Sequence, residues 1–385
     1  MNHPLRPIVL LLLFAACLAA PMLRPLPALA EPVRVIYGFG REFPPFSYER
    51  DGKPTGFEVE LLEAALKGKN IKLTMRPMDW TDVLMDLSEG SIHITSGMAR
   101  TDQRMLLYDF GQHPTVSLKV KVFTQVANRV SNVSQLRGMR VAVQENTLYQ
   151  RILEEVGGLN IKLYKDPVAG IKALANGDVE AYAGADKTTS YFLNKLELPG
   201  ISPIGTPLEI TQMYFAVNKD RPDVLEMINE GMRELVENGE YNRLFRKWFV
   251  PELTKEEQNA LLAAAAESAI NAYAPYSQQS IGAAVMGRSS ILYTGCNVEN
   301  GAPGLTASAL MVAILKAVSN GESEFKAAAV VGPDGSLLMP TAVERRMLHE
   351  FGKEVLVVTE PEQGRYVSRT IFELLPNPYE PISGQ

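Results

Sequence analysis

The sequence predicts an α/β fold in three units, in which two α/β lobes share a two-strand connection and a third α/β unit follows them. The length of 385 residues is enough for two or three domains. From Val33 onward, short β-branched runs alternate with amphipathic helical stretches. This alternation starts again near residue 140 and once more after residue 254, which indicates three successive units.

The composition is that of a globular protein. Hydrophobic residues make up 46% and charged residues 21%, and the mean hydropathy is −0.04, which argues against a disordered chain or a polytopic membrane protein. The net charge is −6, so the chain has no basic surplus for binding nucleic acid. Two cysteines and four histidines exclude a multi-disulfide framework and a metal site built from histidine alone.

Residues 1–30 predict a signal peptide. Arg6 precedes an apolar run over residues 8–20, and Ala28-Leu29-Ala30 has the small residues of a signal peptidase site. The apolar run is shorter than the roughly 20 residues that span a bilayer, so a membrane anchor is disfavoured. A lipoprotein site ending at Cys17 is an alternative. We expect cleavage after Ala30 and soluble release, which leaves Cys296 as the single thiol.

The elements of the first two units follow from their apolar patterns. The first unit has expected strands at 33–39, 71–75 and 92–96 and helices at 59–67 and 80–87; the second has strands at 140–144 and 180–183 and helices at 149–156 and 168–176. The apolar strands at 120–123 and 214–217 are expected to cross between the units. A cleft closed by a two-strand hinge is the consequence.

The rest of the chain completes the second unit and begins the third. Helices are expected at 224–236 and 241–249, a linker at 250–254, and a new helix at 255–272 that Thr254 and Glu257 start with a capping box. Strands are expected at 280–286, 327–331 and 355–358.

The motifs of the first two units resemble the periplasmic solute-binding proteins of the polar amino acid class (family 3). The motifs are Phe43-Pro-Pro-Phe46, Gly52-Lys-Pro-Thr-Gly56-Phe57, Trp80, Gly90, Gly97, Thr101-Asp-Gln-Arg104, residues 138–144 and Lys247-Trp248-Phe249. The resemblance implies a bilobed periplasmic-binding-protein fold over residues 31–252. Its first lobe would cover about 31–122 and 212–252, and its second about 124–210.

The resemblance also implies a site for an amino acid. A carboxylate in a desolvated cleft needs a bidentate donor, and the family position falls on Arg104. The acidic partner of the ammonium points to Asp186, although the spacing after the strand is one residue longer than in the family and Asp186 could instead cap a helix. Phe43 and Trp80 match the rings that enclose the ligand side chain, with core packing as the alternative for both.

Three further contacts are carried over from the motifs. Thr147 stands in a turn before a helix, where a hydroxyl and backbone amides meet the ligand carboxylate. Gly97 belongs to the motif that precedes Arg104. Many relatives have Ser or Thr where this chain has Ala99, so only the backbone amide of Ala99 is expected to contact the ligand, and the preference for an α-amino acid is weakened.

The third unit, residues 255–385, resembles cytidine deaminase. The motifs are Tyr273-Ala-Pro-Tyr276, Gly282-Ala-Ala284, Gly295-Cys296-Asn297-Val298-Glu299-Asn300, Gly304-Leu-Thr306 and Phe372-Glu-Leu-Leu-Pro376. That chemistry needs three Cys or His zinc ligands and a proton-shuttling Glu. The corresponding positions hold Ser308, Leu310, Thr341 and Glu344, so we predict a degenerate domain without metal, cofactor or catalysis.

Other residues of the third unit leave alternative functional roles open. Glu344 and His349 could rebuild a metal site only with a third ligand. Asn297 and Glu299 match the family's ribose contacts, but they could equally stabilise a turn, and Gln279 stands in place of a family aromatic. Cys296 lies outside the metal motif and is expected to be a buried thiol.

The leading hypothesis is a non-enzymatic periplasmic receptor that captures a small polar solute, expected to be an amino acid, for ABC-type uptake through a permease. The third unit would then serve for homo-oligomerisation or docking. Alternatives are a sensory or scaffolding receptor that docks on a membrane sensor, and a cytidine deaminase with an extra domain. No nucleic acid partner is expected.

Overall fold

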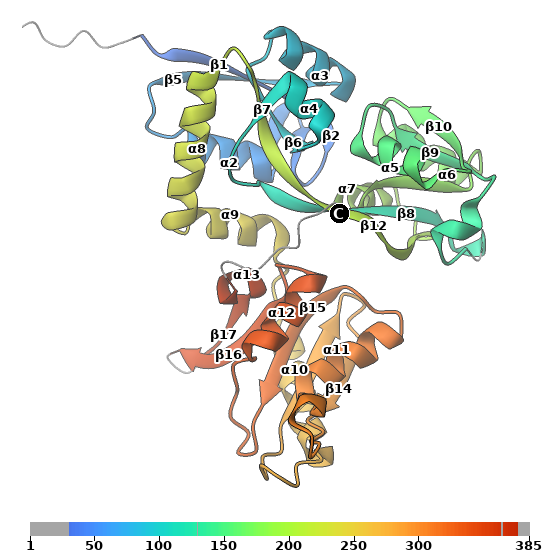
Figure 1. The fold of residues 1–385 in the computed structure, drawn as a ribbon, viewed down its shortest axis with the longest axis vertical. Coiled ribbons are helices and arrows are strands. Elements are labelled where there is room, and N and C mark those ends of the chain that lie inside the picture. Colours follow the sequence, from blue (N-terminus) through green and yellow to red (C-terminus); the bar gives the residue numbers. More distant parts are fainter. Residues whose placement is uncertain (1–30, 129, 363–364, 376–385) are drawn as a thin grey trace, which may run out of the picture.

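The computed structural model describes residues 31–128, 130–362 and 365–375, and it has the predicted bilobed α/β architecture with a further α/β/α unit (Figure 1). The predicted signal peptide and Cys17 lie outside the described residues. Within the described part of the chain, no helix has the length and apolar character needed to cross a membrane.

The first lobe is built on parallel strands. The strand β1 pairs with β5 and β6, and α2 and α3 connect them as in other β-α-β units. Its elements are β1 (Val33–Gly40), β2 (Glu42–Phe43), β3 (Ser47–Arg50), β4 (Lys53–Thr55), α2 (Phe57–Ala65), β5 (Ile71–Met78), α3 (Trp80–Glu89), β6 (Ile94–Ala99), α4 (Asp102–Leu107) and β7 (Tyr108–Phe110).

The second lobe repeats this arrangement on a smaller scale. The parallel strands β10, β9 and β11 form its sheet, and three helices surround them. Its elements are β9 (Arg140–Gln144), α5 (Leu148–Val156), β10 (Asn160–Tyr164), α6 (Pro167–Asn176), β11 (Ala181–Ala185) and α7 (Asp186–Lys195), with short 3-10 turns at Val126–Asn128 and Val133–Leu136.

Two antiparallel strands, β8 (Val116–Gln125) and β12 (Ile201–Asn218), connect the lobes. The nine-stranded sheet runs β10-β9-β11-β8-β12-β6-β1-β5, and β7 pairs with β12, so the two-strand hinge predicted from the sequence is confirmed. The strand β12 is far longer than the run 214–217. Its first half was not recognisable as a strand in the sequence, because it contains Pro203, Gly205 and Pro207. The register of its pairing with β8 shifts between Ile204 and Glu209.

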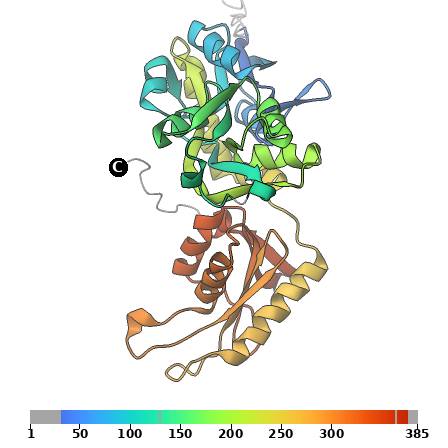
Figure 2. The same cartoon turned by 90° about the vertical axis from the view of Figure 1, so that its right-hand side faces the viewer.

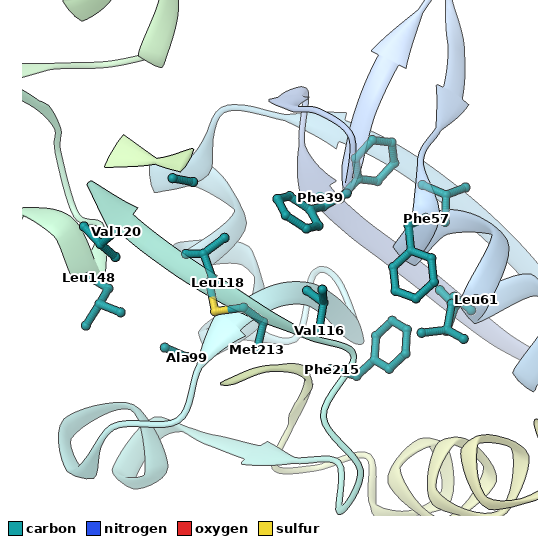
Figure 3. Packing of buried hydrophobic residues seen from close by; sticks show 14 of the residues in the cluster. Phe39, Phe57, Leu61, Ala99, Val116, Leu118, Val120, Leu148, Met213 and Phe215 are labelled. Atoms are coloured by element: carbon teal, nitrogen blue, oxygen red, sulfur yellow. The ribbon is translucent and has the colours of Figure 1, made fainter. Parts of the chain in front are cut away.

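One hydrophobic core extends through the first lobe and across the hinge. Phe39, Phe57 and Leu61 of the first lobe are fully buried, and so is Val120 of β8, while Leu148 of the second lobe belongs to the same cluster. Figure 3 shows Val120 and Leu148 close to each other, with Leu118 and Met213 on the strands between them and the first-lobe aromatics. The hinge strands are therefore packed into the core that both lobes share.

The helices α8 (Pro222–Glu237) and α9 (Glu240–Phe249) return to the first lobe, where α9 packs Phe245 and Phe249 against Phe57. The third unit then begins with α10 (Lys255–Ser268), which starts with the predicted capping box at Thr254. Its sheet runs β14 (Leu292–Cys296), β13 (Gly282–Gly287), β15 (Phe325–Val331), β16 (Leu356–Glu362), β17 (Arg365–Thr370), and its other helices are α11 (Ala309–Ser319), α12 (Ala342–Phe351) and α13 (Ile371–Leu374).

Alternate residues of the five-stranded sheet face different helices. Ala283 and Val285 of β13 pack in one cluster with α11, whereas Ala284 and Met286 pack in another with Leu261 of α10. The helix α10 covers one face of the sheet and α11 and α12 the other, as Figure 2 shows. The helices α11 and α12 were not among the elements expected from the sequence, although the buried residues Leu310, Ala313, Ile314 and Ala317 of α11 have helical spacing.

Candidate binding cleft

A cavity of about 150 Å³ lies between the two lobes. Its walls come from the ends of β1, β2, β5 and β6 and from α3 and α4 in the first lobe, and from the loops before α5 and α6 in the second. We call it the cleft. Its lining residues are Gly40, Arg41, Glu42, Phe43, Ser47, Met78, Asp79, Trp80, Ser96, Gly97, Arg104, Gln144, Thr147, Leu148, Tyr149, Lys165, Asp166 and Met213.

The lobes contact each other directly at the rim of the cleft. The indole Nε1 of Trp80 donates to the carbonyl oxygen of Asn146 at 3.0 Å, and Nδ2 of Asn146 donates to Oγ1 of Thr81 at 3.0 Å. On the other side, Oγ1 of Thr188 donates to the carbonyl oxygen of Pro44 at 2.6 Å. The structure is thus a closed form, with hydrogen bonds that only lobe closure can make.

Arg104 brings a positive charge without a carboxylate partner into the cleft. It belongs to α4, whose first turn Thr101 caps by accepting from the Arg104 amide at 3.3 Å. Its Nη1 donates to the carbonyl oxygen of Ala99 at 3.3 Å, and its guanidinium carbon lies 6.0 Å from the centre of the Trp80 ring. Among the ion pairs of the described residues, none includes Arg104. Burial lowers its pKa, but a guanidinium remains charged.

Gly97 leaves room for the ring of Phe43. Its φ of +67° is a left-handed conformation, and a Cβ there would lie 2.8 Å from Cε1 of Phe43. Phe43 also packs against the buried ring of Phe46, with the ring centroids 4.7 Å apart and the planes tilted by 34°, while it lines the cleft as well. Trp80 faces the cleft from the first turn of α3.

Thr147 is the N-cap of α5. Its hydroxyl donates to the carbonyl oxygen of Gln144 at 2.7 Å and accepts from the amide of Gln150 at 3.4 Å. Thr147 lines the cleft as expected, and its hydroxyl already holds the start of the helix. Ala99 does not line the cleft: its side chain is buried, and its carbonyl oxygen orients Arg104 instead.

The structure places Asp186 outside the cleft. Its carboxylate lies 3.6 Å from Nζ of Lys121, in a larger cavity that faces the third unit. Asp186 directly follows β11, which pairs with β8 (Ala185 opposite Val120), so its carboxylate meets Lys121 of β8 and not the cleft. Asp186 becomes the first residue of α7, and burial raises the pKa of its carboxyl group.

Two other carboxylates take part in the cleft, and the sequence motifs did not point to either. Glu42 follows β1, and Asp166 is the N-cap of α6, where Oδ1 accepts from the amide of Ala169 at 2.7 Å. Within the described residues, Oε2 of Glu42 is buried without a hydrogen-bond partner. Burial and the nearby Asp166 raise the pKa of Glu42. In the sequence, the Asp166-Pro167 pair indicates the start of a helix and does not indicate a ligand contact.

A fully buried carboxyl group stands behind the cleft. Glu58 of α2 accepts from the Gly97 amide at 3.1 Å and from the Thr115 hydroxyl at 2.5 Å. Burial outweighs these hydrogen bonds and raises the pKa of Glu58 to about 7. Glu58 therefore holds the backbone of Gly97, and its protonation changes near neutral pH.

In the third unit, three of the positions that correspond to the metal site of cytidine deaminase take part in helix caps. Ser308 caps α11 by accepting from the Met311 amide at 3.4 Å, and Thr341 caps α12 in a capping box with Glu344. Leu310 is fully buried in the core. Across the described ranges, no group of three or more His, Cys, Asp or Glu side chains is arranged to hold a metal ion.

The remaining polar residues of the third unit also bond locally. Asn297 accepts from the Ile281 amide and donates to the Gln279 carbonyl, both at 2.9 Å. Glu299 accepts from the amides of Tyr276 and Ser277 at 2.8 and 3.2 Å. These bonds fit a turn-stabilising role. The expectation for Cys296 was wrong: its thiol is only partly buried, because β14 is an edge strand of the sheet, and it donates to the Asn271 carbonyl at 3.3 Å.

Comparisons with known proteins agree with the two-part architecture. The sequence profile described as "Bacterial extracellular solute-binding proteins, family 3" matches residues 35–251, and the profile described as "Cytidine and deoxycytidylate deaminase zinc-binding region" matches residues 230–332. We therefore call the third unit the deaminase-like domain. The second match begins in α8 and ends before Thr341.

Individual relatives match over the two lobes. The L-cystine-binding protein TcyJ of Escherichia coli K12 is 26% identical over 226 residues, which cover 57% of this chain and 84% of TcyJ. The probable amino-acid-binding protein YxeM of Bacillus subtilis is 28% identical over 222 residues, covering 56% and 83%. An ancestral arginine-binding protein bound to arginine superposes with a TM-score of 0.54 at 24% identity, over 57% of this chain and 99% of that protein, which shows the fold.

Proposed function

The chain belongs to the bacterial extracellular solute-binding proteins of family 3, and on this premise we propose that it captures an amino acid in the cleft and delivers it for ABC-type uptake. The observation that carries the proposal is the half-buried guanidinium of Arg104, which has no carboxylate partner within the described residues and shares the cleft with Glu42 and Asp166. A zwitterionic amino acid would supply both a carboxylate for Arg104 and an ammonium group for Glu42 and Asp166. Relatives that bind L-cystine or are named as amino-acid-binding support the same class of ligand.

Each end of the ligand has a proposed partner. Arg104 would hold the carboxylate with its planar donors, assisted by the free backbone amides at the start of α5 beside Thr147. Glu42 and Asp166, which come from different lobes, would hold the cationic group in place of Asp186. Phe43 and Trp80 would pack against the rest of the ligand. Because the two carboxylates come from opposite lobes, a bound cation would favour the closed form.

Isothermal titration calorimetry against the standard amino acids and L-cystine tests this proposal. We expect one or more of them to bind with an affinity of about micromolar, which corresponds to roughly −8 kcal/mol. Arg104→Ala should abolish that binding, and Glu42→Gln should weaken it about tenfold or more, since a charge-assisted contact is lost. Exposed Arg50→Ala is the matched control. Absence of binding by any amino acid contradicts the proposal.

For the deaminase-like domain we propose a non-catalytic role in self-association or docking. The support is twofold. Its four expected active-site positions hold Ser308, Leu310, Thr341 and Glu344, and its surface carries many exposed apolar side chains, among them Leu315 and Val318 of α11 and Val343 of α12. We also propose that residues 1–30 direct export to the periplasm and are removed after Ala30.

A further inference from the structure

The deaminase-like domain and the cleft lie on opposite faces of the hinge. Adjacent residues of β12 show this, because Gln212 faces the deaminase-like domain and Met213 faces the cleft. A cavity of about 1000 Å³ separates the domain from the hinge, and it shares no lining residue with the cleft. Figure 1 shows the domain below β8, β12 and α9, with one lobe on either side above it.

The domain is attached to the first lobe through α9. Nη1 of Arg246 lies 2.8 Å from Oε2 of Glu373, and the ring of Phe372 packs against Tyr241 and Phe245 with centroids 5.6 and 5.9 Å apart. Phe372 thereby joins the edge of the hydrophobic core of the first lobe.

The same domain is attached to the second lobe and the hinge by ion pairs. Nζ of Lys187 on α7 lies 2.6 Å from Oε1 of Glu354, and Nζ of Lys121 on β8 lies 2.5 Å from Oε1 of Glu324. One partner of each pair is largely shielded from solvent, since Lys121 is 7% and Glu354 is 16% exposed, whereas Glu324 and Lys187 are 34% and 29% exposed. Burial alone would raise the pKa of Glu354, but the charge and hydrogen bond of Lys187, a backbone hydrogen bond and the charge of Arg288 together lower that pKa to about 2.

These attachments restrict hinge motion. Opening the cleft rotates the second lobe against the first, but the deaminase-like domain has its own packed sheet and can follow only one of them. The contacts to both lobes coexist here with the bonds of the closed rim, such as Trp80 to Asn146. Opening must therefore break the contacts on one side of the domain or distort them.

We propose that the deaminase-like domain acts as a brace that sets ligand affinity. It holds both lobes from behind the hinge and thereby stabilises the closed form. Through this effect, Glu354 and Glu324 raise the ligand affinity without contacting the ligand. This inference rests on the proposed capture of an amino acid. It also gives Asp186 a role, since its carboxylate joins Lys121 in the brace instead of meeting the ligand. A ligand that binds only the closed form gains affinity in proportion to the population of that form.

The test combines Glu354→Gln and Glu324→Gln in the full chain. With the tightest-binding amino acid of the calorimetric panel as the probe, we expect the affinity to fall about threefold to tenfold, through faster dissociation. Small-angle scattering of the protein without amino acid should show a larger radius of gyration for the variant. The matched control is Glu230→Gln, which removes a first-lobe ion pair with Lys69 far from the domain.

The outcomes separate this inference from the proposed function. If the wild type binds no amino acid, the proposed function fails, and scattering still tests the brace. If binding occurs but the double variant keeps the wild-type affinity and dissociation rate, or binds more tightly, the brace is wrong while the proposed function stands. A drop in melting temperature alone, without a change in dissociation rate or scattering, also contradicts the brace.

Discussion

At the scale of single residues, the cleft depends on charges that its own side chains leave unmatched. Among the described residues, the Arg104 side chain has only the carbonyl oxygen of Ala99 as a hydrogen-bond partner, and Glu42 has a buried oxygen that no described group satisfies. Unmatched buried charge is costly. Such a site is stabilised when a ligand of complementary charge arrives, so we expect the ligand to raise the melting temperature of the protein.

Protonation of Glu58 should make stability depend on pH. Its pKa rises from 4.5 to about 7 on folding, so the folded state binds this proton more tightly than the unfolded chain. The contribution of Glu58 to the free energy of unfolding is largest below pH 4.5, decreases as the pH rises towards 7 and is constant above it. The total decrease is up to about 3 kcal/mol.

Glu58→Gln should remove that part of the pH dependence. Urea denaturation at pH 4.5 and pH 8 measures it: the variant should gain stability relative to the wild type at pH 8 and not at pH 4.5. The control is Glu63→Gln, an exposed position on the same helix α2. An equal difference at both pH values would show that Glu58 is not the titrating group.

The sequence motifs located most of the predicted residues that line the cleft, but not its two carboxylates. Phe43, Trp80, Gly97, Arg104 and Thr147 all line the cleft, because the family motifs fix where each strand ends. Asp186 does not line the cleft, because at the start of α7 it lies beside Lys121 of the hinge strand β8, a neighbour that the sequence spacing does not reveal. Glu42 and Asp166 could not be predicted, since their nearness depends on two lobes closing on each other.

At the scale of elements, the helix starts of the deaminase-like domain are held by their own side chains. Thr341 and Glu344 form a reciprocal capping box on α12, with Glu344 accepting from the Thr341 amide at 2.8 Å. The capping boxes at Thr254, Thr341 and Thr370 each contain a Thr and a Glu three residues apart, a pattern that is readable in the sequence. A metal-binding Cys in place of Thr341 would not provide this hydroxyl cap.

Thr341→Ala should therefore destabilise the protein by about 1 kcal/mol, the usual cost of losing an N-cap hydroxyl. Thr341→Ser, which keeps the hydroxyl, is the control and should stay close to the wild type. Treatment with EDTA should leave the melting temperature of both variants and of the wild type unchanged. A drop with EDTA that zinc restores would contradict the assignment of these residues as caps.

Elements with strong local signals were predicted well, whereas β12 was not. The strand β9 was expected over residues 140–144 and spans Arg140–Gln144. The strand β12 runs over 18 residues. Pro203 pairs with Phe123 of β8, whereas Gly205 and Pro207 fall where the register shifts between Ile204 and Glu209. The pairing with β8 on both sides of this irregularity outweighs the poor strand propensity. Tertiary pairing of that kind cannot be read from a local pattern.

At the scale of the whole molecule, the sequence predicted three units but not how the third meets the other two. The ion pairs of Lys187 with Glu354 and of Lys121 with Glu324 join residues more than 160 positions apart, and no spacing rule relates them. The placement of the deaminase-like domain behind the hinge is therefore information that only the structure supplies.

Self-association through the deaminase-like domain is the prediction at this scale. Leu315 and Val318 of α11 are 53% and 41% exposed, and apolar exposure of this kind favours contact with another surface. We expect sedimentation velocity to detect a dimer or a larger oligomer, and Leu315→Glu with Val318→Glu to shift it to the monomer. Leu106→Glu, at an exposed position of α4 in the first lobe, should have no such effect. A monomeric wild type would contradict the prediction.

The caps at Ser308 and Thr341 also bear on what a zinc site in the deaminase-like domain would require. A site of the cytidine deaminase kind needs thiolates at Ser308, Thr341 and Glu344 together with an acid at Leu310. Replacing Ser308 or Thr341 by Cys would remove a hydroxyl cap before any metal could bind, at a cost of about 1 kcal/mol for each helix. A zinc site engineered into this domain would therefore have to offset the loss of both caps with the binding free energy of the metal.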